Sequence, residues 1–326
     1  MTHSVLALLR ILADGHSHSV QELCNRLMLD TVMLEQSIEG LRELNLSVQV
    51  SADGALALRE PLDLLDHQAI ISSLAHNARA WLSRLEVHPV IDSTNNYLLT
   101  QAASGWPSGA ICLAEVQQMG RGRQGRNWLS PFGANLALSL LWRFTTPSAA
   151  VGLSLATGIA VARMLRQAGI TGVGLKWPND VWWRERKLGG VLLESGGTVE
   201  RFYIVAGIGL NVALAREASA LIDQPWVDLQ EIWPGAPVDR NALAASVIGS
   251  LIEAFSRFQD EGFAGFAEEW VRFDQVRGQG VRLHLPNGVV AGIARGVDVT
   301  GALLLETPDG RTTPYLGGEI SLRLAS

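Results

Sequence analysis

The 326-residue sequence has only two cysteines, Cys24 and Cys112, which are too few for a disulfide framework and lack metal-ligand spacing. Their scarcity favours a reducing, cytoplasmic location. No apolar run approaches the ~20 residues of a membrane-spanning helix, and residues 1–12 lack the basic start and cleavage site of a signal peptide. The formal net charge of −6 disfavours a globally basic nucleic-acid binder but leaves a local basic patch open.

Lysine is almost absent as well. Of the 26 basic residues, 24 are arginine, and only Lys176 and Lys187 are lysine. Arginine therefore occupies the ordinary positively charged surface positions. The two lysines become candidates for positions that need a compact ammonium group and not a guanidinium fork. Chance is the alternative explanation.

Two common catalytic signatures are also missing. No GxxxxGK[ST] segment occurs, which excludes a Walker A phosphate loop. The seven histidines are scattered and do not combine with serine, cysteine or aspartate into a recognisable triad.

The hydrophobic content of 48% excludes a wholly disordered chain. The length favours two or three domains, and we predict an α+β protein with three, at residues 1–62, 63–274 and 275–326. In the first range we expect three helices followed by a hairpin. The helices are expected over residues 5–12, from Ser19 to residue 27 and over 31–44. This order is typical of a winged helix-turn-helix.

The central range mixes strands and helices. Residues 136–142 and 203–208 are short apolar runs that suit buried strands, and residues 149–168 and 241–259 have helical periodicity. The last range contains short strands separated by turn dipeptides, which predicts a small all-β barrel. These strands are expected at 281–285, 289–294, 301–306 and 320–324.

Residues 120–126, Gly-Arg-Gly-Arg-Gln-Gly-Arg, form the densest local motif, called here the Gly-Arg loop. Its glycines permit positive φ and inward-turned N–H groups, and its arginines offer bidentate donors to phosphate oxygens. The motif predicts a polyphosphate site. A solvated flexible loop or a nucleic-acid contact would have the same composition.

Each lysine lies in a second unusual segment. In Lys176-Trp-Pro-Asn-Asp180, the lysine suits a phosphate or carboxylate, and Asp180 suits a base, a metal ligand or the counter-ion of Lys176. A structural ion pair is the simpler reading. Lys187 precedes Gly189-Gly190, a step that permits close ligand approach but also suits a tight turn.

Three further segments carry weaker signals. Gly207-Ile-Gly209 ends an expected buried strand. In Asp92-Ser-Thr-Asn-Asn96, Ser93 suits a helix cap better than a ligand contact. Trp226 suits the core unless a nucleotide site is otherwise supported, in which case it suits base stacking.

Together, these segments resemble the bacterial bifunctional biotin–protein ligase and biotin operon repressor family from about residue 60 to the end. The N-terminal range matches in layout and only weakly in sequence. The resemblance rests on several motifs in the same order: Val90–Asn95, Glu115–Gln118, Gly120–Trp128, Ser130–Asn135, Lys176–Asp180, Lys187–Leu192 and Gly317–Leu322.

The resemblance implies a biotin/lipoate-ligase-like catalytic domain, an SH3-like C-terminal barrel and a two-step reaction. Biotin and ATP form biotinoyl-5′-AMP with Mg²⁺, and biotin then passes to a lysine of the biotin carboxyl carrier protein of acetyl-CoA carboxylase. It implies no tightly bound metal, and it suggests a homodimer on adenylate binding and operator DNA as a partner.

It also assigns residues. Catalysis would fall to Lys187, Arg123, Lys176 and Asp180, although an ordinary aspartate is a poor base at neutral pH. Biotin would be bound by Ser93, Thr94, Asn95, Gln117, Arg121, Gly122, Arg123, Lys187 and Gly190. ATP and the adenylate would be bound by Arg121, Arg123, Arg126, Trp128, Lys176, Asn179, Asn211, Leu221, Ile222 and Trp226.

Two alternatives stay open: a biotin-sensing repressor with little ligase activity, and a lipoate or octanoate ligase. The N-terminal range also departs from a DNA-binding pattern. Residues 1–63 contain nine acidic and four basic side chains, a net charge of −5. Because phosphate contacts dominate DNA affinity, we predict that this domain binds operator DNA weakly or not at all.

Overall fold

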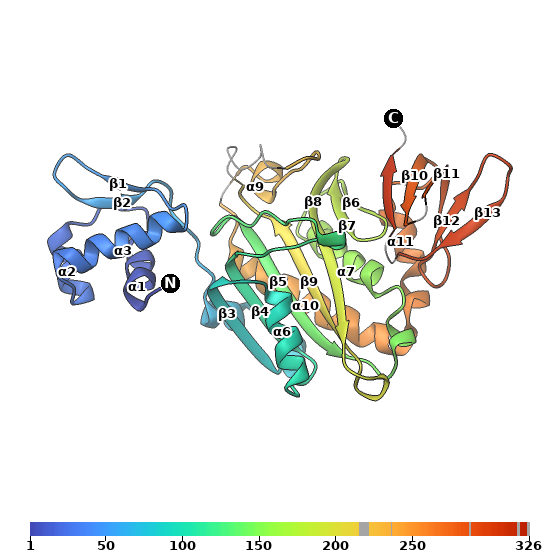
Figure 1. Cartoon of the computed structure of the whole chain (residues 1–326), viewed down its shortest axis with the longest axis horizontal. Helices are drawn as coiled ribbons and strands as arrows, with labels where there is room; N and C mark the ends of the chain where they lie inside the picture. Colours follow the sequence, from blue (N-terminus) through green and yellow to red (C-terminus); the bar gives the residue numbers. More distant parts are fainter. Residues whose placement is uncertain (215–221, 236, 287, 318–319, 325–326) are drawn as a thin grey trace.

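The computed structural model describes residues 1–214, 222–235, 237–286, 288–317 and 320–324. Its N-terminal part lies at one end of the elongated molecule in Figure 1. This part contains three helices and a two-stranded antiparallel sheet, as expected: α1 (His3–Leu12), α2 (Val20–Leu27), α3 (Thr31–Glu43), β1 (Val48–Val50) and β2 (Leu56–Leu58).

The helix starts of this part follow the predicted caps. The Ser19 hydroxyl accepts the N–H of Glu22, and the Asp30 carboxylate accepts the N–H of Met33, which satisfies N–H groups that have no partner inside the helix. The helices bury a leucine core of their own that includes Leu8 and Leu34. Phe132 from the central part joins that core, so the two parts meet beside the Gly-Arg loop.

The central part is a seven-stranded mixed sheet in the order β3-β4-β5-β9-β8-β7-β6. Only the β3–β4 pair is parallel. Its strands are β3 (Arg84–Ile91), β4 (Ala110–Gln117), β5 (Asn135–Arg143), β6 (Val173–Lys176), β7 (Asp180–Trp183), β8 (Arg186–Gly196) and β9 (Tyr203–Asn211).

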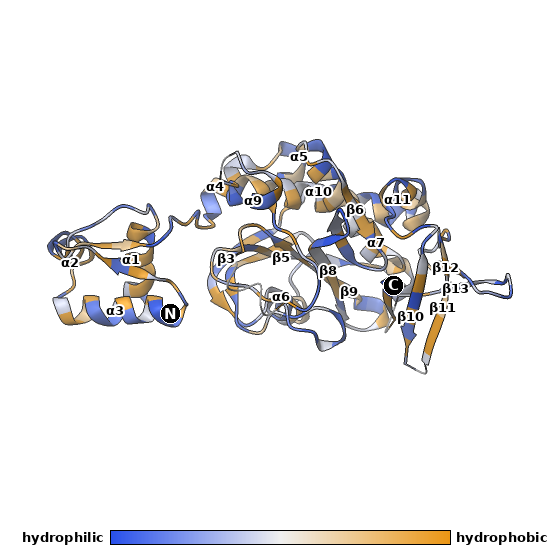
Figure 2. Cartoon of the chain, turned by 90° about the horizontal axis from the view of Figure 1, so that it is seen from above, coloured by the Kyte–Doolittle hydropathy of each residue, from blue (hydrophilic) through white to orange (hydrophobic). Residues whose placement is uncertain are grey.

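Helices cover both faces of this sheet. Figure 2 shows α6 on one face and the group containing α4, α5 and α10 on the other. The helices are α4 (His67–Ser73), α5 (His76–Trp81), α6 (Thr94–Ala103), α7 (Leu153–Gln167), α9 (Leu229–Ile232), α10 (Arg240–Glu261) and α11 (Ala267–Phe273).

Helix α7 differs from the expectation in two ways. It begins at Leu153, four residues later than predicted, because Gly152 has a φ of +85° and interrupts the preceding turn. The stretch 147–167 is also long and apolar enough to cross a membrane by composition, so the expectation that no apolar run approaches that length is wrong. About 61% of that stretch is buried inside the fold, where α7 packs in the main core.

The C-terminal part is a five-stranded antiparallel sheet in the order β13-β12-β11-β10-β14. It contains β10 (Gly280–Leu285), β11 (Gly288–Val297), β12 (Leu303–Glu306), β13 (Thr312–Tyr315) and β14 (Ser321–Leu324). Strand β13 was not predicted. It is short, and its centre, Pro314, cannot donate a ladder hydrogen bond. The sheet shares the core of the central part, and the Trp177 indole donates to the carbonyl of Gly301.

Candidate active site

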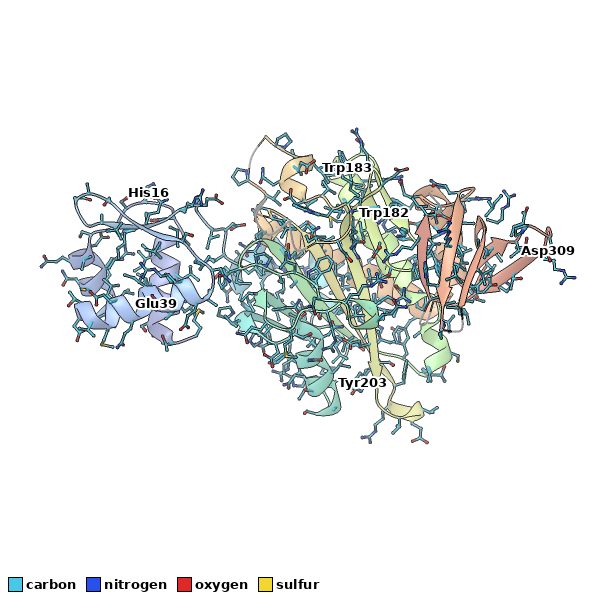
Figure 3. All side chains as sticks on the ribbon, turned by 45° about the horizontal axis from the view of Figure 1, so that its top comes forward. His16, Glu39, Trp182, Trp183, Tyr203 and Asp309 are labelled. Atoms are coloured by element: carbon cyan, nitrogen blue, oxygen red, sulfur yellow. The ribbon has the colours of Figure 1, made fainter. Side chains whose placement is uncertain are left out.

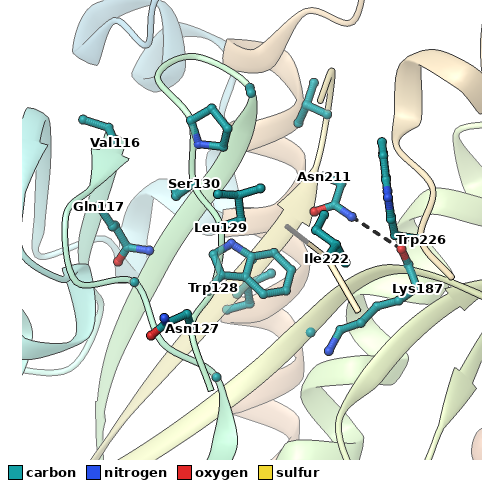
Figure 4. A pocket seen from close by; sticks show the side chains of 18 of the residues that line it. Val116, Gln117, Asn127, Trp128, Leu129, Ser130, Lys187, Asn211, Ile222 and Trp226 are labelled. Atoms are coloured by element: carbon teal, nitrogen blue, oxygen red, sulfur yellow. Dashed lines mark hydrogen bonds between the residues drawn. The ribbon is translucent and has the colours of Figure 1, made fainter. Parts of the chain in front are cut away.

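One cavity of about 1770 Å³ collects the sequence-predicted residues. Its wall is built from the start of α6, the end of β4, the Gly-Arg loop, the β6–β8 edge and the segment 222–226, and the linker 58–63 and Arg323 reach its rim. Every predicted site residue lies on this wall except Leu221, which is outside the described residues. Figure 4 shows Trp128, Lys187, Asn211 and Trp226 around the same space.

The Gly-Arg loop is held by a narrow stem. Arg121 and Asn127 form an antiparallel bridge, and the N–H of Gly122 donates to the carbonyl of Arg126. Its glycines permit positive φ, but only one of the three adopts it. Gly125 does so at +69°, together with the non-glycine Gln124 at +57°.

Gly120 is needed for space and not for its backbone angles. A Cβ there would lie 2.8 Å from the carbonyl oxygen of Trp128. The Trp128 N–H in turn donates to the Gly120 carbonyl. The loop is therefore tied at its base to the segment that carries the indole.

The three loop arginines do not point at one shared position. Arg121 pairs with Glu194, whose oxygen lies 2.7 Å from its Nη2. Arg123 donates to Asn179 and to the carbonyls of Gly317 and Ile320, which connects the loop to the C-terminal part. Arg126 is exposed and contacts Gln124.

Asp180 is the ion-pair partner of Lys187, with 2.7 Å between Oδ1 and Nζ. It also lies opposite Lys176 in the β6–β7 register, but the pairing that the sequence suggested with Lys176 is not the one formed. Burial lowers the pKa of Lys176 to about 8, and Arg323, Lys187 and Arg126 oppose its charge, whereas Asp180 favours it. Two ammonium groups and one carboxylate thus give this wall a net positive charge.

The glycines of Gly207-x-Gly209 have a packing role. A Cβ on Gly207 would lie 2.4 Å from the Asn95 amide oxygen, and one on Gly209 would lie 2.7 Å from the Trp128 ring. Both glycines are on β9 in the middle of the sheet. Because they lack a Cβ, the Asn95 amide and the Trp128 indole can pack directly on the sheet.

The polar segment before α6 both caps that helix and borders the cavity. Ser93 is the N-cap residue, and its hydroxyl accepts the N–H of Asn96. Gln117 Oε1 accepts from both the N–H and the hydroxyl of Thr94. Because an amide oxygen points at Thr94, the NH₂ group of Gln117 is the end available as a donor.

Segment 222–226 closes the opposite wall. The N–H of Lys187 donates to the Pro225 carbonyl, and the N–H of Val227 donates to the Lys187 carbonyl. This pairing puts Trp226 beside the start of β8. Asn211 fixes the same place by donating to the carbonyls of Lys187 and Val227. A half-buried Trp226 and Trp128 across the cavity offer two indoles to a planar ligand.

Sequence reasoning missed two groups of residues that organise the site. Glu194 and Ser139 hydrogen-bond directly to Asn95. A buried ion pair between Glu115 and Arg240, 2.7 Å apart, lies under β4 and holds the linker through the Asp63 carbonyl. No local motif marks Glu194, Ser139 or Arg240, because they come from strands or helices distant in sequence, and the Glu115–Gln118 motif alone does not indicate that Glu115 pairs with Arg240.

Comparison with known proteins defines the class. Residues 87–211 match the biotin/lipoate A/B protein ligase family, and residues 277–323 match the biotin protein ligase C-terminal domain. The chain belongs to the biotin protein ligases of this family.

Relatives cover nearly the whole chain. It is 43% identical to the bifunctional ligase/repressor BirA of Salmonella typhimurium over 98% of both chains. It is 36% identical to the biotin–[acetyl-CoA-carboxylase] ligase of Mycobacterium tuberculosis, over 81% of this chain and 96% of that protein. The biotin protein ligase of Aquifex aeolicus in complex with biotin and ATP has 29% identity and a TM-score of 0.63, covering 75% of this chain and all of that one.

Proposed function

We propose that this chain is an ATP-dependent biotin–protein ligase that activates biotin to biotinoyl-5′-AMP and transfers it to a lysine of the biotin carboxyl carrier protein. The observation that carries the proposal is the convergence of both lysines of the chain, the Gly-Arg loop and two indoles on one cavity. A site that only sensed biotin would have no need of a cationic wall for a polyphosphate. We infer that the enzyme works in the cytoplasm, where ATP is supplied.

The first step joins two anions. The biotin carboxylate oxygen attacks the α-phosphorus of ATP, the bond to the β-phosphate oxygen breaks, and pyrophosphate leaves. Charge neutralisation is the main task in such a reaction. In our proposal Lys187, oriented by Asp180, faces the carboxylate and α-phosphate, and Lys176 and the loop arginines face the phosphates.

Binding roles follow the walls of the cavity. We assign biotin to the side of Ser93, Thr94, Gln117 and Gly190, and adenine to the indoles of Trp226 and Trp128 next to Asn211 and Ile222. Asn95, Arg121 and Arg123 have internal partners in the structure. Arg123 must therefore exchange carbonyl partners for ligand oxygens if it binds the adenylate.

Mg²⁺ enters this proposal as the counter-ion of the ATP phosphates. It prefers hard oxygen ligands and commonly binds through one or two carboxylates plus phosphate oxygens. Asp180 and Asp223 are carboxylates on the cavity wall, and they would be the protein oxygens available to the ion beside the phosphates.

In the second step the carrier lysine attacks the acyl carbon, AMP leaves, and the amine loses a proton. Asp180 is the candidate acceptor of that proton. Its Oδ1 already lies 2.7 Å from Lys187 Nζ, so this carboxylate is engaged with that ammonium group. We therefore assign Asp180 first to orienting Lys187.

We further propose three domains, at 1–62, 63–274 and 275–326. The leucine core of the first range, which Phe132 of the central part also joins, supports its boundary. Three helices followed by a two-stranded sheet support a winged helix-turn-helix, and the antiparallel strand order of the last range supports a small SH3-like barrel. A homodimer formed on adenylate binding belongs to the same proposal.

One experiment tests the activity and its substrate. The full chain is incubated with ATP, Mg²⁺, a biotin carrier domain and labelled biotin, lipoate or octanoate, with a carrier whose acceptor lysine is replaced by arginine as control. We expect biotin alone to become attached, in a lysine-dependent way. Transfer of lipoate or octanoate instead would identify an acyl ligase of another specificity, and binding without transfer would identify a sensor.

A further inference from the structure

Glu194 is an acidic residue beside a site for two anionic substrates. Its carboxylate on β8 lies next to Arg121 at the base of the Gly-Arg loop and next to Asn95 at the start of α6. A negative charge here opposes the binding of anions, so its presence calls for a reason other than charge.

The contacts of Glu194 supply that reason. Its Oε1 accepts from Arg121 Nη2 at 2.7 Å, and its Oε2 accepts from Asn95 Nδ2 at 2.7 Å. An ionised carboxylate accepts hydrogen bonds and donates none, so it can satisfy both donors at once. No neutral side chain of the same shape has two acceptor oxygens.

This arrangement fixes which way the Asn95 amide faces. Its NH₂ group donates to Glu194 and to the carbonyl of Leu192, so its oxygen must face Ser139. The single hydroxyl proton of Ser139 is then directed to that oxygen, at 2.6 Å. Ser139 Oγ also lies 2.7 Å from Thr94 Oγ1. Because the Ser139 proton goes to Asn95, this contact needs the Thr94 hydroxyl to turn from Gln117 toward Ser139, while the Thr94 N–H stays on Gln117. Thr94 lines the cavity.

Asn95 is 4% exposed, and both of its N–H groups and its oxygen are occupied inside the protein. It therefore acts through its neighbours and not by direct contact with a ligand. Thr94 and Arg121, which border the cavity, are the residues that this network holds in place.

We propose that Glu194 is a positioning residue for the biotin end of the site, acting through Asn95 and Ser139 on Thr94 and through Arg121 on the stem of the Gly-Arg loop. The inference rests on the proposed function. It predicts that the loss of Glu194 weakens biotin binding more than it slows turnover, because the reacting groups near Lys187 are held by other contacts.

Glu194→Gln tests this with little change in shape. One end of the glutamine amide would place N–H groups against the Asn95 or Arg121 donor. We expect the Kd for biotin, measured by titration calorimetry without ATP, to rise about tenfold. The KM for biotin should rise in parallel, and kcat and the KM for ATP should change less than threefold. Glu200→Gln, an exposed carboxylate beyond the end of β8, is the matched control.

The double variant Asn95→Asp/Glu194→Gln exchanges donor and acceptor between the two positions. The introduced glutamine can then donate to the introduced aspartate and accept from Arg121, and Ser139 still donates to position 95. We expect it to bind biotin at least threefold more tightly than either single variant. It keeps the test valid if Glu194→Gln folds poorly, because the donor–acceptor match between the two side chains is restored and only the longer hydrogen bond to the Leu192 carbonyl is lost.

The outcomes separate the two proposals. Unchanged biotin affinity in Glu194→Gln, or a double variant no better than the singles, would overturn the positioning role while wild-type biotinylation stands. A wild-type chain that neither binds nor transfers biotin would overturn the function itself.

Discussion

Lys187 is the residue on which the proposed first step depends most, because its ammonium lies inside the cavity beside a carboxylate and an indole. Lys187→Ala removes the charge that would face the reacting oxygens. Loss of one such donor costs about 2–4 kcal/mol of transition-state stabilisation. We expect pyrophosphate release at saturating biotin and ATP to slow roughly 30- to 1,000-fold.

Arg184→Ala is the control for this variant, since it removes an exposed cation from the turn between β7 and β8. Its rate should match that of the wild type. A near wild-type rate for Lys187→Ala would remove Lys187 from the site.

Lys176 makes a second prediction at the residue scale, this time about pH. Its pKa is lowered to about 8, so its charge is present below pH 8 and is lost as the pH rises further. If that charge binds phosphate, kcat/KM for ATP, which reports the free enzyme, should fall above pH 8. Lys176→Met should have a low kcat/KM for ATP that no longer falls above pH 8. If its pH profile ran parallel to that of the wild type, the phosphate-binding role of Lys176 would be contradicted.

The Gly-Arg loop is the element with the clearest expected motion. Without a bound anion, its arginines would repel one another if they gathered around the site. Its glycines also lower its intrinsic order. We expect trypsin to cut after these arginines more slowly when biotin and ATP are present. Arg311, exposed in the turn between β12 and β13, provides an internal reference site. Equal cutting with and without ligands would show that the loop is not the clamp.

The link between α2 and β2 is expected to respond to pH. His18 is buried and exchanges two backbone hydrogen bonds with Leu56. Burial lowers the pKa of His18, but hydrogen bonds to Asp14 and Glu22 outweigh it and raise this pKa above its usual value. The folded state therefore binds the proton more tightly than the unfolded state.

This stabilisation is complete below the unfolded pKa, ~6.5, and is lost as the pH rises through the raised folded value. We expect hydrogen exchange at the Leu56 amide to accelerate over that range, after correction for intrinsic exchange. His18→Gln should flatten the response, and His16→Gln, an exposed neighbour, should leave it unchanged. A wild-type response identical to that of His18→Gln would contradict the assignment.

At the scale of the whole molecule, the acidic surface of the N-terminal part leads us to expect weak DNA binding. The exposed side of α3 carries Glu35, Glu39 and Glu43, and its one arginine, Arg42, is paired with Glu39. Glu39 lies on the outer side of that helix in Figure 3. Phosphates would be repelled from this surface, although a dimer that gathered Arg10, Arg26 and Arg42 could offset the repulsion.

We expect no binding tighter than ~10⁻⁷ M, the weak edge of the specific range, to the promoter of the organism's own biotin genes with biotin and ATP present. Fluorescence anisotropy at several salt concentrations measures this. Glu35→Lys/Glu39→Lys should acquire salt-sensitive DNA binding, which shows that the assay detects it. Salt-sensitive binding of the wild type with a Kd below ~10⁻⁷ M would contradict the prediction.

Local sequence predicts an element correctly where the features that form it lie within that element. Ser19 caps its helix as predicted, and the periodicity of residues 241–259 predicts the long helix α10. Alternation does not predict β13, because in Thr-Thr-Pro-Tyr only Tyr315 packs against the core. The turn chemistry of the Gly-Arg loop was misjudged, because Gln124 adopts a positive φ usually left to glycine.

The sequence by itself determined the class of protein, because its motifs are contiguous segments whose order along the chain is specific. It also indicated which residues meet in the cavity, since the resemblance assigns these motifs to one site and the described ones line one cavity. Only the tertiary structure decided how those residues pair. Lys187 and not Lys176 holds Asp180, and Glu194 and Ser139 orient Asn95. Such pairings depend on the lateral register of β5, β8 and β9, and strand register is set by packing of the whole sheet.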